Sequence, residues 1–166
     1  MEIFSGMRPM RRKDRQVTDP AVIREIIAGC DCCRLGLRDG ERTYIVPLDF
    51  GFTEEDGRYT FYFHSAREGR KIDLVRENGW ASFEMDTGHQ WVPDEIACEY
   101  TARFRCVMGG GPVTLLETAE EKRAGLAAVM AHVSGGEGPW DFDPAMVERT
   151  AVLRLEAEEL TCKIHP

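Results

Sequence analysis

Alternation of apolar and polar side chains along the chain predicts a protein built mainly from β-strands. Tyr59, Phe61 and Phe63 recur with a period of two, which is typical of a strand over 59–64. Further strands are expected at residues 32–37, 42–52, 80–85, 98–108 with a continuation at 113–117, and 151–157. Turn sequences at 39–40 and 55–57 indicate that the early strands are joined as hairpins.

Two segments have a helical period and recognisable starts. Asp19 before Pro20 predicts a capped helix that ends at Gly29. Thr118 and Glu121 have the spacing of a capping box, and they precede the longest helical pattern of the chain. The apolar stripe of that helix is expected to comprise Leu126, Val129, Met130 and Val133. A short helix is expected from residue 144.

These elements favour a mainly β fold over a doubly wound one, because strands and helices do not alternate along the chain. About six strands linked mostly by hairpins predict a closed antiparallel barrel with helices packed outside it. Pro47 cannot donate to a strand ladder, which places it at an edge or a bulge. The glycines of 109–111, followed by Pro112, predict a bulge or bend. We expect residues 1–166 to form a single domain.

Charge and composition exclude several classes of function. The net charge is −8, whereas residues 1–15 carry a local charge of +3 and are expected to form a flexible basic N-terminal arm. The rest of the chain is therefore strongly acidic, and we expect no nucleic-acid partner for a protein with that charge. No apolar run reaches the roughly 20 residues that a membrane span needs, and no secretory leader is recognisable. We therefore expect a cytoplasmic protein with no membrane partner.

Six cysteines are expected to remain reduced in that compartment. Cys30 and Cys33 have C-x-x-C spacing, with Cys32 between them. A zinc site would need a second such pair or paired histidines, and the sequence offers neither. We expect no metal site, and buried free thiols are the simpler interpretation of this cluster.

The segment after the 59–64 strand has the composition of a phosphate-binding corner. Ser65 stands three residues before Glu68, which is capping-box spacing and predicts a helix start. Gly69 permits close approach of a ligand, and Arg70 and Lys71 are cations beside the expected helix N-terminus. The alternative interpretation is an ordinary capped helix with solvated basic residues.

Several segments resemble the NimA-like, nitroimidazole-resistance branch of the pyridoxamine 5′-phosphate oxidase-like flavoproteins. They are MRRKDRQVTD, YIVPLDFGF, FYFHSAREGRKIDLVREN, FRCVMGGG and LTCK, which follow in order from about Met7 to Lys163. The resemblance implies a six-stranded, Greek-key, antiparallel split β-barrel that binds FMN. It also implies a homodimer with FMN at the subunit interface; FAD or haem is less expected than FMN.

Carried over by position, the resemblance assigns Arg70, Lys71 and Ser65 to the flavin phosphate and the strand around Pro47 to the flavin ring. The implied cofactor-binding set comprises Val46, Pro47, Leu48, Asp49, His64, Ser65, Ala66, Gly69, Arg70, Lys71, Cys106, Val107 and Gly109. Cys106 stands where the family usually has serine, and a thiol is the weaker hydrogen-bonding group. Asp49 stands where asparagine is frequent, and its carboxylate is expected to point away from the flavin.

The function implied by the resemblance is an FMN-dependent oxidoreductase, specifically a nitroreductase acting on a small flat nitroaromatic. His64 is the candidate catalytic residue, since imidazole exchanges protons near neutral pH; it could instead only bind the cofactor. One alternative is a flavin-binding protein for sensing, storage or electron relay. Another is pyridoxamine phosphate oxidation, which is disfavoured because the sequence shows no second basic cluster for a substrate phosphate.

Overall fold

The computed structural model describes residues 10–166, and nine strands and four α-helices form within that range. The strands are β1 (Gln16–Val17), β2 (Cys33–Asp39), β3 (Arg42–Leu48), β4 (Phe50–Glu55), β5 (Arg58–Ala66), β6 (Trp80–Val92), β7 (Thr101–Leu116), β8 (Thr150–Glu156) and β9 (Glu159–His165). The helices are α1 (Pro20–Ala28), α2 (Arg70–Asn78), α3 (Ala119–Ser134) and α4 (Pro144–Arg149), preceded by a 3₁₀ turn, η1 (Lys13–Arg15).

All strand pairs are antiparallel, and the main path runs β3-β2-β6-β7-β8-β5-β4. β9 pairs with both β7 and β1. The end strands β3 and β4 do not pair with each other, so the sheet curls into a split barrel rather than the closed barrel expected from the pattern. The expected mainly β, antiparallel class is confirmed, although the expected count of six strands is too low.

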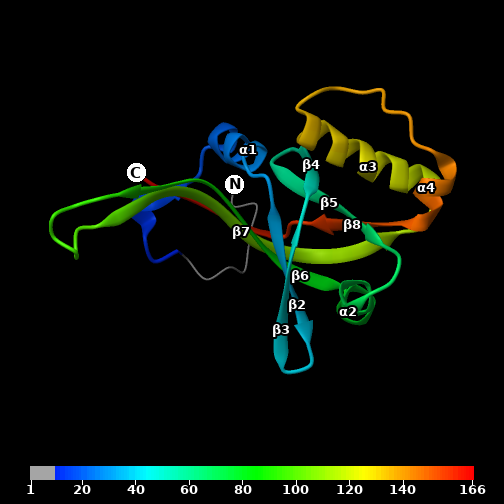
Figure 1. Ribbon diagram of the computed structural model, residues 1–166, viewed down its shortest axis with the longest axis horizontal. Helices are drawn as coiled ribbons and strands as arrows, with labels where there is room; N and C mark the ends of the chain where they lie inside the picture. Colours follow the sequence, from blue (N-terminus) through cyan, green and yellow to red (C-terminus); the bar gives the residue numbers. More distant parts are fainter. Residues whose placement is uncertain (1–9) are drawn as a thin grey trace.

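The core lies inside the curled sheet and is closed by helices (Figure 1). Phe61 and Phe63 are fully buried, as the alternation over 59–64 predicts, and Phe50 is fully buried as well. Each such side chain contributes about 1.5–3 kcal/mol of burial free energy. α1 adds Ile26 and Ile27 to this core, and α3 lies along β4, β5 and β8 in Figure 1.

Two predicted helix starts are confirmed in atomic detail. Asp19 accepts a hydrogen bond from the backbone N–H of Ala21 at 2.9 Å. The Thr118 hydroxyl accepts from the Glu121 N–H at 3.2 Å while the Glu121 carboxylate accepts from the Thr118 N–H at 3.1 Å, which completes the capping box. α1 ends at Gly29, as expected, and α2 and α3 also end at glycines, whereas α4 ends at Thr150.

The stripe predicted for α3 is confirmed only in part: Val129 is buried, and Leu126 and Met130 are half-buried. Val133 is 53% exposed, and the buried positions of the helix are Lys122, Gly125 and Val129. A Cβ at Gly125 would lie 2.8 Å from Val152, so this glycine lets the helix sit close against β8. The close approach at Gly125 decides which side of α3 faces the sheet. The apolar pattern does not contain this information, so it does not give the buried side of α3 correctly.

Three strand predictions also need correction. The expected 42–52 strand is broken at Asp49, because β3 pairs with β2 while β4 pairs with β5 on the far side of the sheet. The expected loop after residue 85 is strand as far as Val92, with a register shift between Thr87 and Gln90. Pairing with β6 continues through residues 109–112 without the register shift that a bulge, predicted there, would cause. β9 was not predicted.

The predicted basic arm falls partly outside the described residues, since positions 1–9 are not among them. Within residues 10–15, η1 follows Arg12, whose Nε donates to Asp14 at 2.8 Å, and the expected flexibility of the arm remains a prediction. Gln16 and Val17 then pair with β9. Within residues 10–166, no helix has both the length and the apolar character that crossing a membrane requires.

Candidate functional site

Ser65 lies near the end of β5, where it pairs with Ala151 of β8. Its hydroxyl oxygen is buried and has no hydrogen-bond partner among the described residues. A buried hydroxyl without a partner costs free energy, so such a group is rare in a folded protein unless a ligand or water satisfies it. The Ser65 hydroxyl is therefore the polar group in this region that most needs a hydrogen-bond partner from a ligand or from water.

The chain leaves β5 at Ala66 and enters α2 through Gly69, whose φ of 124° favours glycine. A Cβ at Gly69 would have no atom within 4 Å, so the space beside the helix start is open. The predicted cap at Ser65 is wrong: α2 begins at Arg70, and Gly69 provides no side-chain cap. Pairing with β8 continues through Ala66, which holds Ser65 in extended conformation and prevents a helix there.

The first turn of α2 consequently has unsatisfied donors. The Gly69 carbonyl accepts from Ile72 at 2.9 Å and from Asp73 at 3.2 Å, whereas the N–H groups of Arg70 and Lys71 precede the helical ladder. Lys71 is half-buried and has no ion-pair partner in the described chain. An open helix N-terminus beside an unpaired ammonium is a favourable environment for a phosphate or other anion.

Arg70 is already engaged with the β2–β3 hairpin. Its Nε donates to Oδ2 of Asp39 at 2.8 Å, and its guanidinium carbon lies 4.7 Å from the centre of the Tyr44 ring. The predicted phosphate ligand Arg70 thus lies at the helix start but contacts a carboxylate. Asp39 and Tyr44 were not recognised from the sequence, because only the folded hairpin brings them to α2.

His64 precedes Ser65 on β5, so the two side chains project from opposite faces of the strand. His64 is exposed, opposite Val152, and has no hydrogen-bond partner among the described residues. No carboxylate of residues 10–166 orients the imidazole, and its candidate catalytic role remains a prediction.

The predicted flavin-ring segment forms an edge of the sheet. β3 has a single neighbour, β2, so the backbone groups along its outer side lack a strand partner. This confirms the edge position expected for Pro47. Val46 and Leu48 are half-buried, whereas Pro47 and Asp49 are exposed.

The third predicted group lies elsewhere in the same sheet. Val46 pairs with Leu35, Leu35 with Phe83, and Phe83 with Gly109. Three strand spacings, about 14 Å, therefore separate Val46 from Gly109. The two segments are not adjacent within one chain.

Cys106, Val107 and Gly109 are packed closely in this chain. Cys106 and Val107 are buried, and burial raises the pKa of the Cys106 thiol. A Cβ at Gly109 would lie 2.0 Å from the carbonyl oxygen of Glu159 and 2.6 Å from Phe83, so the glycine is required for packing.

Pro47 and Cys106 nevertheless share one face of the sheet, since directly paired residues project to the same side. Pro47 pairs with Arg34, and Arg34 pairs with Glu84. The Arg34 guanidinium donates to Asp86 at 2.6 Å and to Glu84 at 3.0 Å; these bonds raise the pKa of Arg34. This charged cluster, between the two predicted segments, was missed because its members are some 50 positions apart in the chain.

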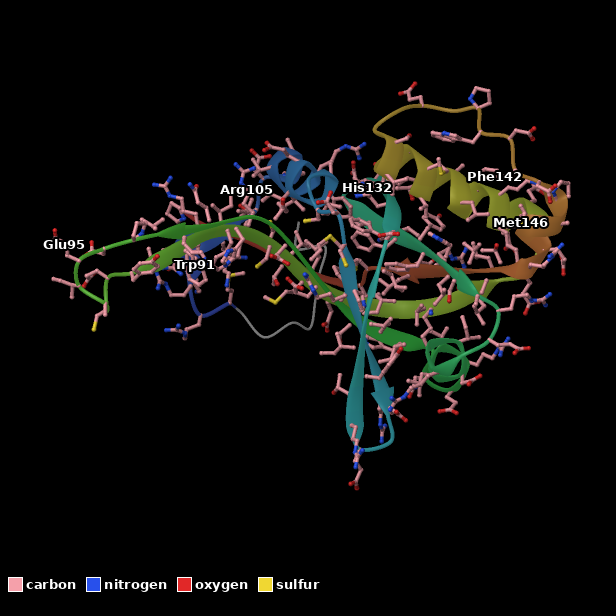
Figure 2. All side chains as sticks on the ribbon, viewed as in Figure 1. Trp91, Glu95, Arg105, His132, Phe142 and Met146 are labelled. Atoms are coloured by element: carbon pink, nitrogen blue, oxygen red, sulfur yellow. The ribbon has the colours of Figure 1, made fainter. Side chains whose placement is uncertain are left out.

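The same face continues along the β6–β7 hairpin, which extends away from the rest of the molecule (Figure 1). Trp91 pairs with Ala102 on this hairpin and is 64% exposed; Figure 2 shows it well away from α3. The rings of His89 and Trp91 are 5.1 Å apart. Large apolar side chains are thus displayed to solvent on an extended arm.

The remaining chemistry-bearing candidates have structural explanations. His132 contacts the Cys30 carbonyl oxygen through Nε2 at 2.8 Å, and its ring lies 4.3 Å from that of Phe50. It therefore links α3 to the end of α1 (Figure 2). Burial raises the pKa of Cys30 to about 12, which keeps its thiol protonated. No group of three or more potential metal ligands occurs among residues 10–166.

Comparison with known proteins identifies relatives of the whole chain. A family model described as pyridoxamine 5′-phosphate oxidase matches residues 19–164. The structure is similar to that of a candidate 5-nitroimidazole antibiotic resistance protein from Bacteroides thetaiotaomicron, with 30% sequence identity and a TM-score of 0.75. That likeness covers 97% of this chain and 90% of the Bacteroides chain. None of the curated proteins matches this chain.

Two more distant structures share the fold alone. The flavocytochrome Anf3 from Azotobacter vinelandii is 19% identical with a TM-score of 0.78, covering 99% of this chain and 75% of its own. An FAD- and heme-binding protein from Mycobacterium smegmatis is 14% identical with a TM-score of 0.74, covering 90% of this chain and 73% of its own. Because the family match spans nearly all of the described residues and the fold agrees, this chain belongs to the pyridoxamine 5′-phosphate oxidase family.

Proposed function

We propose that the chain binds FMN and is a flavin-dependent oxidoreductase that reduces small flat nitroaromatic compounds. The observation that carries the proposal is the buried, unpartnered Ser65 hydroxyl beside the uncapped start of α2. The oxygens of a phosphate monoester would accept hydrogen bonds from the Ser65 hydroxyl and from the first N–H groups of α2. The helix dipole also favours its negative charge. The 30% identity to a candidate 5-nitroimidazole resistance protein supports the choice of substrate class.

The residues present fit the phosphate end of such a cofactor. Ser65 would donate its hydroxyl, and the N–H groups of Arg70 and Lys71 would complete the anion site with the Lys71 ammonium. The open position at Gly69 leaves room for close approach. The free edge of β3, from Val46 to Asp49, would face the polar edge of the flavin ring. Bound FMN would supply the electron-transfer chemistry, while these residues hold and orient it.

Reduction of a nitro group consumes protons together with electrons, so the site needs a proton source. The exposed His64 imidazole is the candidate donor in this chain. An exposed imidazole is equally able to contact the cofactor without transferring a proton. Substitution of His64 by glutamine, which hydrogen-bonds without titrating, separates these two roles through the pH profile of turnover.

We further propose that the working unit is a homodimer with FMN at the subunit interface. Ile45, Trp91 and Met108 are large, exposed and apolar, and each projects from β3, β6 or β7. Burying such a surface against a second copy would be favourable. A second copy would also provide the Cys106–Gly109 segment, which lies about 14 Å from Val46 within one chain.

A second candidate function is flavin binding for sensing, storage or electron relay. The absence of any described partner that orients His64 favours it, because acid–base catalysis ordinarily uses an oriented group. This protein would bind FMN and accept electrons without turning over a nitro substrate.

The visible spectrum of the purified native protein, with chromatography of the material released by heat, tests the proposal. Flavin absorption and about one FMN per chain are expected, followed by reoxidation of the reduced protein by a 5-nitroimidazole. A colourless protein that takes up no added FMN would overturn the flavin assignment. FMN that is reduced but not reoxidised by nitro compounds would support the second candidate.

A further inference from the structure

Lys122 is the single charged residue among the buried residues of the described chain, with 6% of its surface exposed. It lies in the first turns of α3, and no ion pair or side-chain hydrogen bond involves it within residues 10–166. The aliphatic stem of Lys122 accounts for this burial, whereas its Nζ is not among the fully buried polar atoms that lack a partner. The ammonium is therefore an unpaired cation at the edge of the core, and an anion bound beside it would be stabilised.

An open cleft of about 550 Å³ lies beside Lys122. Its lining residues come from the C-terminal half of α2, the end of β7 and the junction of α4 with β8. These elements lie towards the right of Figure 1. Val75, Leu115 and Ala151 give it an apolar side, and Arg67 and Arg76 add two further cations. A volume of this size suits a small organic molecule.

Each of the two arginines that line the cleft has a carboxylate within ion-pair distance. Arg67 pairs with Glu148 at 3.3 Å, and Arg76 lies 3.9 Å from Asp73 on the same helix. Glu117 also lines the cleft but is not within ion-pair distance of Lys122. Lys122 is consequently the cation left without a carboxylate, and it is the most deeply buried of the three.

We propose that this cleft is a binding site for a small organic anion, a carboxylate or phosphate ester on a compact aliphatic body, with the Lys122 ammonium as its anchor. Neither Ser65 nor Lys71 lines the cleft, although Arg67, which lies between them in the chain, does. The sequence showed no second basic cluster because Arg67, Arg76 and Lys122 converge only in the folded chain.

Thermal unfolding of the purified protein tests the site with three probes that share one alkyl chain: butyrate, butyl phosphate and butylammonium. Sodium chloride at equal ionic strength is the reference. We expect a saturable rise in Tm with butyrate, butyl phosphate or both, and none with butylammonium. Comparison of the two anions identifies the preferred head group.

Lys122→Met keeps the buried volume and removes the charge, so it should weaken anion affinity about tenfold or more. Arg58→Met is the matched control, since Arg58 is exposed in the β4–β5 turn region and does not line the cleft. Arg76→Gln, at an exposed cation of the cleft, should weaken binding about threefold and tests the site even if Lys122→Met does not fold.

Equal anion-induced shifts in the wild type and Lys122→Met, or no saturable shift in the wild type, would overturn the proposal. So would an equal shift with butylammonium, or unchanged affinity in Arg76→Gln. The flavin content of each variant is measured in parallel. Because neither Ser65 nor Lys71 lines the cleft, loss of anion binding with unchanged flavin content separates this inference from the proposed function.

Discussion

The guanidinium of Arg70 donates to the carboxylate of Asp39, and this contact ties the first turn of α2 to the tip of the β2–β3 hairpin. Both side chains are substantially exposed to solvent, so the pair contributes at most about 1 kcal/mol to stability. Its importance is local: Asp39 holds a negative charge beside the proposed phosphate site and occupies one of the two cations there.

Asp39→Asn is expected to raise FMN affinity about two- to threefold, because it removes that charge and frees Arg70. The unfolding midpoint should change little. Fluorescence titration of the apoprotein with FMN measures the effect, with Asp56→Asn in the β4–β5 turn as the control. A several-fold loss of affinity would show instead that Asp39 positions Arg70 for binding.

Ser65→Ala should have opposite effects on stability and on binding. Without ligand, the variant should be as stable as the wild type or up to about 1–2 kcal/mol more stable, since it loses a buried unsatisfied hydroxyl. FMN affinity should fall about tenfold, because a bond to a charged phosphate is lost. Denaturant unfolding and flavin titration measure the two quantities; equal affinity would remove Ser65 from the site.

Lys71→Glu should reduce FMN binding by about a hundredfold or more, since it replaces an attractive charge with a repulsive one at the helix start. Arg76→Glu makes the same charge change on the same helix, at a side chain that is 61% exposed. Flavin content after purification and subsequent titration compare the two. Similar losses in both variants would indicate a general electrostatic effect rather than a phosphate contact.

Gly109→Ala should destabilise the protein by about 1–3 kcal/mol or prevent folding, because its Cβ would lie 2.0 Å from a backbone oxygen of β9. Gly36→Ala is the matched control in another strand, where the nearest atoms would be 3.8 Å away. Urea unfolding of both variants tests the contrast. A stable Gly109→Ala protein would mean that β7 and β9 can separate at no cost.

Unfolding free energy should fall at alkaline pH partly through Cys162. Burial raises the pKa of Cys162 to about 11 from an ordinary value of 9.0, so the folded chain holds this proton more tightly than the unfolded chain does. The stabilisation is therefore complete below pH 9 and decreases as pH rises towards 11. Cys162→Ala should show a flatter decrease over this window, whereas Cys98→Ala, at an exposed thiol, should match the wild type.

Local signals predicted the local parts of this structure well. The alternation around Phe61, the Asp19 cap and the Thr118–Glu121 box depend on residues close in sequence, and each is confirmed. The Ser65 cap failed because pairing with β8, more than 80 residues later, holds that segment extended. The strand after Met85 was missed because its stability depends on β7 rather than on its own alternation.

The candidate site also combines features that are local in sequence with features that depend on long-range pairing. The corner at Ser65–Lys71 is continuous in sequence and could be proposed from it. Asp39, Tyr44 and the Arg34 cluster reach this corner or the adjacent sheet face only through long-range pairing. Lys122 was not recognised because a lysine in a helix is ordinarily solvated. Its burial follows from the close approach of α3 at Gly125.

The pairing of β7 with β6, β8 and β9 has a consequence for the order in which the protein can form. Two of these three partners come from the last part of the chain, after α3 and α4. Contacts between distant segments slow folding, since a long loop must close before they can form. During synthesis, β7 therefore retains unpaired positions until residue 165 has emerged from the ribosome, and a chaperone that shields this strand would raise the yield of folded protein.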